Sequence, residues 1–365
     1  MKPERIVISG GGTGGHIFPA LAIADAFRRL APGCQILFIG AEGRMEMEKV
    51  PAAGYPIEPI RIEGLNRRNP LQNFVVAAKL LKALRDCQRI LRTFRAQLVV
   101  GTGGFVSGPA LWAAAGMGLP VVIQEQNSVP GLTNKILGRK ARLVCTAYPG
   151  LEKYFPRSRV VLTGNPVREQ IENLHPSRTE ACQRLGLDPA EPVVLVYGGS
   201  QGALGLNRFV EEHASELNKG KIQVLWQTGA HFLKRAEELV QSQSLTRIHP
   251  VGFIEEMHQA YAAADLVVSR AGAMTISELA LCAKAAILVP LPTAAHNHQY
   301  LNARTLQDTS AAICIPEKEL KDRLMPTLQD LIRDERSRLQ LSEKIRGFAR
   351  PHAAEAIVHA ILNVV

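Results

Sequence analysis

Short apolar runs alternate with amphipathic segments along the whole 365-residue chain. Runs of this kind, rich in β-branched residues, are typical of strands that are buried on both faces. Nine of them are predicted as strands: 5–9, 35–40, 97–101, 120–124, 142–146, 192–198, 223–229, 265–270 and 286–291. Apolar residues follow helical spacing in most of the segments between them. Alternating strands and helices predict an α/β protein whose parallel sheets are joined by right-handed crossovers.

The two halves of the chain resemble each other. The loop GGTGG (11–15) corresponds to GGSQG (198–202), and LVVGTGGFVSGPAL (98–111) corresponds to LVVSRAGAMTISEL (266–279). We therefore expect two Rossmann-like domains that face each other across a cleft, with ligands beyond the carboxyl ends of the strands. A turn-rich stretch at 162–168 predicts the hinge. The expected domains are 1–163 and 164–350, with a C-terminal helix at about 351–365 packing back on the first domain.

The positive charge lies in one half of the chain. The formal net charge is +10; residues 1–165 hold 22 Lys and Arg against 10 Asp and Glu, whereas residues 166–365 hold 21 against 23. A one-sided basic field indicates an anionic partner for the N-terminal half. Aromatic residues make up 5% of the chain and do not interleave with the basic ones, which argues against nucleic acid. Six scattered cysteines without a CxxC pair predict reduced thiols, and we expect neither a signal peptide nor a membrane span.

Glycine-rich turns follow several predicted strands. GGGTGGH (10–16) contains G-x-G-x-x-G, but a dinucleotide site needs an acidic residue about 20 positions later, and the nearest, Glu42, comes late. Similar turns recur at 103–104, 198–199 and 272. Any one of them could serve only tight strand-to-helix packing. Four on one predicted sheet edge favour a phosphate or sugar ligand held by backbone N–H groups.

The most specific segment is SRAGAMTISE (269–278). It predicts a tight turn before a helix, with hydroxyls at Thr275 and Ser277 and a carboxylate at Glu278. Backbone N–H groups and hydroxyls can hold a diphosphate, and the carboxylate can accept hydrogen bonds from two ribose hydroxyls. Alternatively, Glu278 only complements the helix dipole.

Together these segments carry a family resemblance. GGTGGH, GTGGFVSGP, QEQNSVPGLTNK, TGNPVR, GGSQGA, GFIEEM, SRAGAMTISE and HNHQYLNAR occur in that order, over residues 6–305. The chain thus resembles the MurG family, bacterial transferases that add N-acetylglucosamine (GlcNAc) to a lipid-linked muramyl-peptide precursor of peptidoglycan. The resemblance implies the GT-B fold and an inverting transfer from UDP-GlcNAc to the 4-hydroxyl of lipid I, which gives lipid II.

The resemblance also implies residue roles. Asn127 and Gln299 would contact the GlcNAc, Arg168 and Ser200 the diphosphate, the backbone of Ile254 the uracil, and Glu278 the ribose. The full set implied for UDP-GlcNAc is Thr13, Gly14, Gly15, Asn127, Arg168, Ser200, Ile254, Ala273, Met274, Thr275, Ile276, Ser277, Glu278 and Gln299. One position departs from the family pattern: many members read H-E-Q-N where this chain has Gln124.

The implied reaction needs a base for the acceptor hydroxyl and stabilisation of the departing diphosphate. His16, at the junction of the first loop and its helix, is the candidate base, because an imidazole ordinarily titrates near neutrality. Glu125 is the alternative, and for His16 a structural capping role remains open. None of the eight aspartates forms an Asp-x-Asp pair, so we expect no metal and no cofactor.

A basic segment at 61–95 holds nine Lys and Arg against two acids. Apolar residues at Leu71, Phe74, Val75, Ala78, Leu81, Leu84 and Leu91 follow one helical stripe. A Rossmann crossover helix explains its second half. For its first half we expect docking on an anionic membrane through Arg67, Arg68, Leu71, Phe74, Lys79 and Lys82. The implied location is the cytoplasmic side of the inner membrane, as a peripheral protein, with contacts to other cell-wall synthesis and division proteins.

Overall fold

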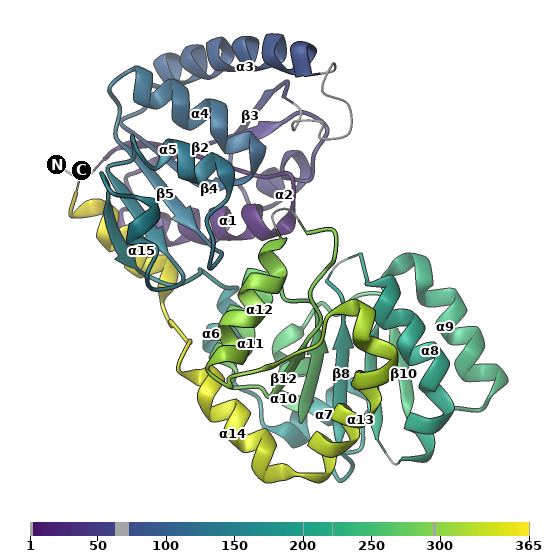
Figure 1. Cartoon of the computed structure of the whole chain (residues 1–365). Coiled ribbons are helices and arrows are strands. Elements are labelled where there is room, and N and C mark those ends of the chain that lie inside the picture. Colours follow the sequence, from purple (N-terminus) through teal and green to yellow (C-terminus); the bar gives the residue numbers. More distant parts are fainter. Residues whose placement is uncertain (1–2, 63–72, 200, 221, 295–296, 365) are drawn as a thin grey trace. The chain divides into compact units, whose positions relative to one another are not determined.

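The computed structural model describes residues 3–62, 73–199, 201–220, 222–294 and 297–364, with only the backbone described for 73–78 (Figure 1). The chain divides into two compact units. The N-terminal unit comprises Met1–Arg168 and Arg350–Val365, and the C-terminal unit comprises Glu169–Ala349. Each unit is α/β, with a fully parallel sheet among its described residues.

The sheet of the N-terminal unit has the order β3-β2-β1-β4-β5-β6-β7. Its strands are β1 (Arg5–Gly10), β2 (Gln35–Ala41), β3 (Ile57–Ile60), β4 (Leu98–Gly103), β5 (Val121–Glu125), β6 (Leu143–Thr146) and β7 (Arg159–Leu162). Its helices are α1 (Gly14–Leu30), α2 (Glu46–Ala52), α3 (Asn73–Phe94), α4 (Gly104–Gly116), α5 (Leu132–Leu137), the 3₁₀ turn η2 (Glu152–Tyr154) and α15 (Ala353–Leu362). The central strands are apolar on both faces because helices cover both sides of a parallel sheet.

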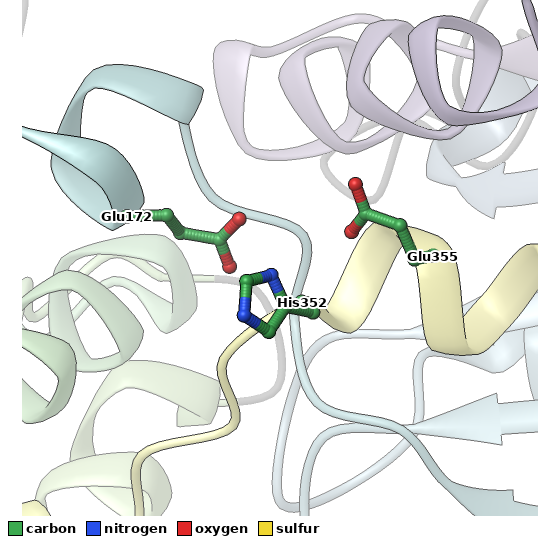
Figure 2. A group of neighbouring side chains, drawn as sticks. All are labelled: Glu172, His352 and Glu355. Atoms are coloured by element: carbon green, nitrogen blue, oxygen red, sulfur yellow. The ribbon is translucent and has the colours of Figure 1, made fainter. Parts of the chain in front are cut away.

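The last helix of the chain belongs to the N-terminal unit. Ile357, Val358 and Ile361 of α15 are fully buried in the same core cluster as Phe27 of α1. At the start of α15, Glu355 forms an ion pair with Arg29 of α1. Figure 2 shows Glu355 beside His352, the residue that precedes α15; the third labelled residue, Glu172, is part of α6 in the other unit. Burial of its apolar face therefore fixes α15 on the N-terminal sheet.

The sheet of the C-terminal unit has the order β10-β9-β8-β11-β12-β13. Its strands are β8 (Val193–Tyr197), β9 (Gln223–Gln227), β10 (Ile248–Val251), β11 (Leu266–Ser269), β12 (Ala286–Leu288) and β13 (Ile313–Cys314). Its helices are α6 (Glu169–Asn173), α7 (Arg178–Leu185), α8 (Leu204–Lys219), α9 (Ala230–Ser242), α10 (Met257–Ala263), α11 (Ala273–Leu281), α12 (His298–Asp308), the turn η4 (Glu317–Glu319), α13 (Leu320–Arg333) and α14 (Glu335–Arg346). The β8–α8 and β11–α11 junctions hold the glycine-rich turns that repeat those of the first unit.

All nine predicted strands are present, and four more were not predicted: β3, β7, β10 and β13. These four are the edge strands of the two sheets. Three of them are largely half-buried or exposed, so their sequences lack a continuous apolar run.

The predicted apolar stripe of α3 is wrong at Leu81, whose exposed fraction is 59%. The buried side of the described part of α3 carries Ala83, Cys87, Ile90 and Leu91 instead. Leu80 is also exposed, so two adjacent leucines face solvent next to the exposed Lys82. The helix is therefore apolar on its core side and mixed, basic and apolar, on its outer side.

Candidate active site

The first glycine loop connects β1 to α1 and is held in place by a buried carboxylate. Gly12 has a φ of +81°, a conformation that a side chain rarely adopts. Its N–H donates to Glu46 Oε2 at 3.0 Å, and the N–H of Ala41 donates to Glu46 Oε1 at 3.1 Å. Glu46 is fully buried, and its carboxylate leaves no room for a Cβ at Gly11. Glu46, which anchors this loop to the end of β2, was not predicted from the sequence.

His16 lies in the first turn of α1 and is half-buried. Its Nδ1 is 3.1 Å from the carbonyl oxygen of Thr102, and the Thr102 hydroxyl donates to the His16 carbonyl at 2.8 Å. A carbonyl oxygen can only accept, so this contact selects the tautomer with the proton on Nδ1. The Nε2 atom then carries the lone pair that proton abstraction requires. A Cβ at Gly103 would lie only 2.9 Å from His16 Nδ1, so this glycine leaves room for the ring.

A buried amide network supports the same carbonyl. Gln126 Nε2 donates to Thr102 O at 2.5 Å, and Asn165 Nδ2 donates to Gln126 O at 3.1 Å. Gln124 donates through Nε2 to Asn165 Oδ1 at 2.9 Å and accepts from Gln126 through its own Oε1. Gln124 is fully buried and cannot titrate. At the position where many MurG members have histidine, this chain therefore has a structural hydrogen-bonding residue.

Glu125, the alternative base, is 1% exposed and accepts four hydrogen bonds. Its Oε1 accepts from Asn127 N at 2.9 Å and Asn127 Nδ2 at 3.2 Å. Its Oε2 accepts from Gly131 N at 3.1 Å and Asn134 Nδ2 at 2.8 Å. Four donors occupy the acceptor sites of the carboxylate, so the geometry assigns Glu125 to shaping the 126–131 loop rather than to proton transfer.

The other predicted residues of the N-terminal unit lie near these loops or at its boundary. Thr13 precedes α1, Gly14 and Gly15 begin it, and Asn127 lies in the loop that Glu125 organises. Arg168 is half-buried and is the last residue before the C-terminal unit. The structure thus assigns Arg168 to the N-terminal unit by its contacts.

In the C-terminal unit, the β8–α8 loop is packed against the end of β9. A Cβ at Gly202 would lie 2.0 Å from Thr228 O, so only glycine fits there. Gln227 links this loop to the next one: its Nε2 donates to Gly199 O at 2.8 Å, and its Oε1 accepts from Ile254 N at 3.1 Å. The backbone N–H of Ile254 is thus engaged by Gln227. The predicted Ser200 lies outside the described residues.

Helix α11 begins at Ala273, after Gly272, and no described side chain caps its N-terminus. The first-turn N–H groups of Ala273, Met274 and Thr275 have no carbonyl within the helix to bond. Such a terminus attracts anions through its N–H groups and the helix dipole. Ser277 donates its hydroxyl proton to Ala273 O at 3.0 Å, and Ile276 is buried in the helix core face. The backbone, more than these side chains, therefore provides the anion-binding groups.

Glu278, one turn further along α11, is 7% exposed. The hydroxyl of Tyr261 donates to Glu278 Oε2 at 2.9 Å, and the hydroxyl oxygens of Tyr261 and Tyr197 are 2.7 Å apart. The two rings meet edge to face, with centroids 6.3 Å apart. Neither tyrosine was predicted from the sequence as part of the site. The only signal for Tyr197 was its place at the carboxyl end of a strand, directly before the glycine loop.

The remaining predicted residues fall outside these clusters. Gln299 lies in the first turn of α12, where its Oε1 accepts from Leu291 N at 2.9 Å. Arg67, Arg68 and Leu71 lie outside the described residues, as does the side chain of Phe74. Lys79 is half-buried and Lys82 is exposed on α3. No helix in the described part of the chain is both long and apolar enough to cross a membrane.

Comparisons with known proteins point to one family of glycosyltransferases along nearly the whole chain. Residues 6–146 match the model of the glycosyltransferase family 28 N-terminal domain, and residues 193–357 match that of the C-terminal domain. A UDP-N-acetylglucosamine--N-acetylmuramyl-(pentapeptide) pyrophosphoryl-undecaprenol N-acetylglucosamine transferase of Porphyromonas gingivalis is 47% identical over 362 residues, which cover 99% of this chain and 96% of the relative. The protein of that name from Parabacteroides distasonis is 44% identical over 365 residues, covering 100% and 99%. The crystal structure of MurG from Acinetobacter baumannii superposes with a TM-score of 0.80 at 31% identity, covering 99% of this chain and 100% of that one.

Proposed function

The chain belongs to glycosyltransferase family 28 and, within it, to the MurG family, and from this premise we propose that it transfers GlcNAc from UDP-GlcNAc to lipid I. The acceptor is the 4-hydroxyl of the MurNAc-pentapeptide carried on undecaprenyl pyrophosphate, and the product is lipid II. The full-length identity of 47% to a transferase of that name carries the proposal. The fold is GT-B, two Rossmann-like units in one chain.

The C-terminal unit binds the donor. The N-terminus of α11, which no side chain in the described part of the chain caps, receives the diphosphate, because its N–H groups and dipole favour negative charge. Glu278 accepts hydrogen bonds from the ribose, and Ile254 and Gln299 contact the uracil and the GlcNAc. Ser200 adds a contact to the diphosphate, and so does Arg168, the last residue of the N-terminal unit before Glu169. Charge that develops on the departing UDP is thereby stabilised by groups that are already oriented before reaction.

The N-terminal unit binds the acceptor and supplies the base. His16 Nε2 takes the proton of the 4-hydroxyl while the hydroxyl oxygen attacks the anomeric carbon. The bond from that carbon to the β-phosphate oxygen breaks, its electron pair leaves with UDP, and the α-linkage becomes β. The Thr102 carbonyl fixes the ring of His16 and stabilises the imidazolium formed, since Nδ1–H donates to it in both states.

The same unit docks on the membrane. The acceptor lipid stays in the bilayer, so the enzyme must work at its surface. Leu80 and Leu81 are 41% and 59% exposed beside Lys82 on α3. On α4, which packs along α3, Trp112 is 44% exposed and Lys140 Nζ lies 4.4 Å from the centroid of its ring. Basic and apolar side chains of this kind support reversible, salt-sensitive binding to an anionic cytoplasmic leaflet, together with the predicted set at 67–82.

Release of UDP tests the proposal. The protein is incubated with UDP-GlcNAc in the presence and absence of a lipid-linked muramyl-pentapeptide, and UDP is quantified. Release that requires the acceptor is the expected result. Release without acceptor, or conversion of UDP-GlcNAc into another UDP-sugar, would instead indicate a hydrolase or an epimerase on the same fold.

A further inference from the structure

Three buried groups in the C-terminal unit form a continuous hydrogen-bonded chain that the proposed chemistry does not itself require. Glu278 accepts from Tyr261 at 2.9 Å, and Tyr261 contacts Tyr197 at 2.7 Å between hydroxyl oxygens. Tyr261 is 1% exposed and Tyr197 is 5% exposed. The three residues come from α11, α10 and the end of β8, so the chain connects separate elements.

The direction of this chain follows from counting protons. A phenol has one proton to donate. Because Tyr261 donates its proton to the Glu278 carboxylate, its oxygen must accept the proton of Tyr197 in the 2.7 Å contact.

Both phenols remain donors under all ordinary conditions. Burial raises the pKa of Tyr261 well above its usual value and also raises that of Tyr197, with the nearby Glu278 adding to both shifts. The two tyrosines therefore stay neutral and keep their protons for hydrogen bonding. A carboxylate that accepts a hydrogen bond from a phenol held in place by packing keeps one orientation.

We propose that Tyr261, backed by Tyr197, is a positioning residue that holds the Glu278 carboxylate for recognition of the ribose hydroxyls of the nucleotide. This inference rests on the proposed function, in which Glu278 binds the ribose. Ribose hydroxyls are donors to a carboxylate, and they gain most when the acceptor is ionised and already oriented. The tyrosine pair thus contributes to selectivity for the ribose rather than to affinity for the diphosphate.

Discrimination between two nucleotides tests the proposal. Dissociation constants for UDP and for 2′,3′-dideoxy-UDP, which lacks both ribose hydroxyls, are measured by calorimetry on the full-length protein. The preference is the ratio of the second constant to the first. Tyr261→Phe keeps the ring and removes the donor, and we expect it to lower the preference about tenfold, the scale of one hydrogen bond to a charged group. Tyr197→Phe should lower it less, because Tyr261 can still donate.

Tyr148→Phe is the matched control, since Tyr148 is buried in the other unit and its hydroxyl has no partner among the described residues. It should leave the preference at the wild-type value. A merely structural role for Tyr261 would weaken binding of both nucleotides equally, and an unchanged preference in Tyr261→Phe would overturn the proposal. If Tyr261→Phe fails to fold, an unchanged preference in Tyr197→Phe overturns it. A wild-type protein without any preference would overturn it too, while acceptor-dependent UDP release would still report separately on the transferase activity.

Discussion

The carboxylate of Glu46 is hydrogen-bonded to the backbone of Gly12, with 3.0 Å between Oε2 and N. Its other oxygen accepts from Ala41 at the end of β2, so one fully buried side chain joins the first glycine loop to the neighbouring strand. On the other side of the same loop, a Cβ at Gly104 would lie 2.4 Å from Gly11 O. The loop that leads into His16 is therefore held between two close packing contacts.

Glu46→Gln should lower both thermal stability and turnover. The amide can accept from one N–H but turns its own NH₂ toward the other, which costs about 1–3 kcal/mol for a buried unsatisfied donor. We expect a reduced melting temperature and reduced kcat with unchanged UDP affinity, because Glu278, Ile254 and the N-terminus of α11, which are proposed to bind UDP, belong to the other unit. Glu58→Gln, at an exposed glutamate on β3, is the control and should change neither quantity. Wild-type stability and kcat in Glu46→Gln would show that the loop does not depend on this carboxylate.

His16→Ala should lower kcat by about 10²–10⁴-fold, the usual effect of losing a general base. UDP affinity should stay the same, since His16 is assigned to acceptor chemistry. Steady-state kinetics and UDP calorimetry on the same preparation separate the two effects. Turnover close to wild type in this variant would remove His16 from the mechanism.

Glu125→Gln, in contrast to His16→Ala, should lower stability more than turnover. Four donors converge on this carboxylate, and an amide would place an NH₂ group against at least one of them. We expect a loss of about 1–3 kcal/mol in the free energy of unfolding, measured by urea denaturation. The kcat of the folded fraction should fall much less than in His16→Ala. A stable protein with the larger loss of kcat would identify Glu125 as the base instead.

Whether a strand could be predicted from the sequence depended on its position in the sheet. Interior strands such as β1 and β8 are buried on both faces. Each is therefore a continuous apolar run that can be recognised from its own residues. The edge strands β3 and β10 contain Pro59 and Pro250 and have exposed or half-buried positions. Edge strands tolerate proline and need no apolar run, so their pairing depends on neighbours rather than on local sequence.

The loops of the candidate site could be found from sequence because glycines and small residues after a strand leave a visible pattern. The residues that hold these loops left none. Glu46 lies 34 positions from Gly12, and Tyr197 lies 64 positions from Tyr261. In the sequence, Glu46 is an acidic residue at the start of a helix and Tyr197 is a tyrosine at the end of a strand. Only the fold brings their hydrogen-bonding partners next to them. For α3 the sequence placed Leu81 on the buried stripe, whereas packing against the core uses the side that carries Ala83 and Cys87.

Activity should survive removal of divalent metal ions. The sequence has no Asp-x-Asp pair, and the N-terminus of α11 offers N–H groups for the departing diphosphate. Initial rates with UDP-GlcNAc and a lipid-linked acceptor should be the same with excess EDTA as without it. Full loss of activity that is restored by Mg²⁺ or Mn²⁺ would assign leaving-group stabilisation to a metal ion.

Membrane binding should depend on salt and on the basic and apolar residues of the segment 67–82. We expect cosedimentation with vesicles containing anionic phospholipid, weak binding to neutral vesicles, and release at high salt. Changing Arg67, Arg68, Lys79 and Lys82 to Glu should abolish binding, and Leu80→Ser with Leu81→Ser should weaken it. UDP affinity is the internal control and should not change. Equal binding of the wild type and the quadruple variant would exclude this segment from membrane docking.

The most direct test of the central claim is the fate of radiolabelled GlcNAc. The protein is incubated with labelled UDP-GlcNAc and lipid I, the lipid fraction is extracted, and the linkage in its labelled product is determined by NMR. We predict label in a lipid-linked disaccharide in which GlcNAc is joined by a β-linkage to the 4-hydroxyl of MurNAc. Label that stays in the aqueous fraction, or a lipid product with an α-linkage, would contradict the proposed inverting transfer.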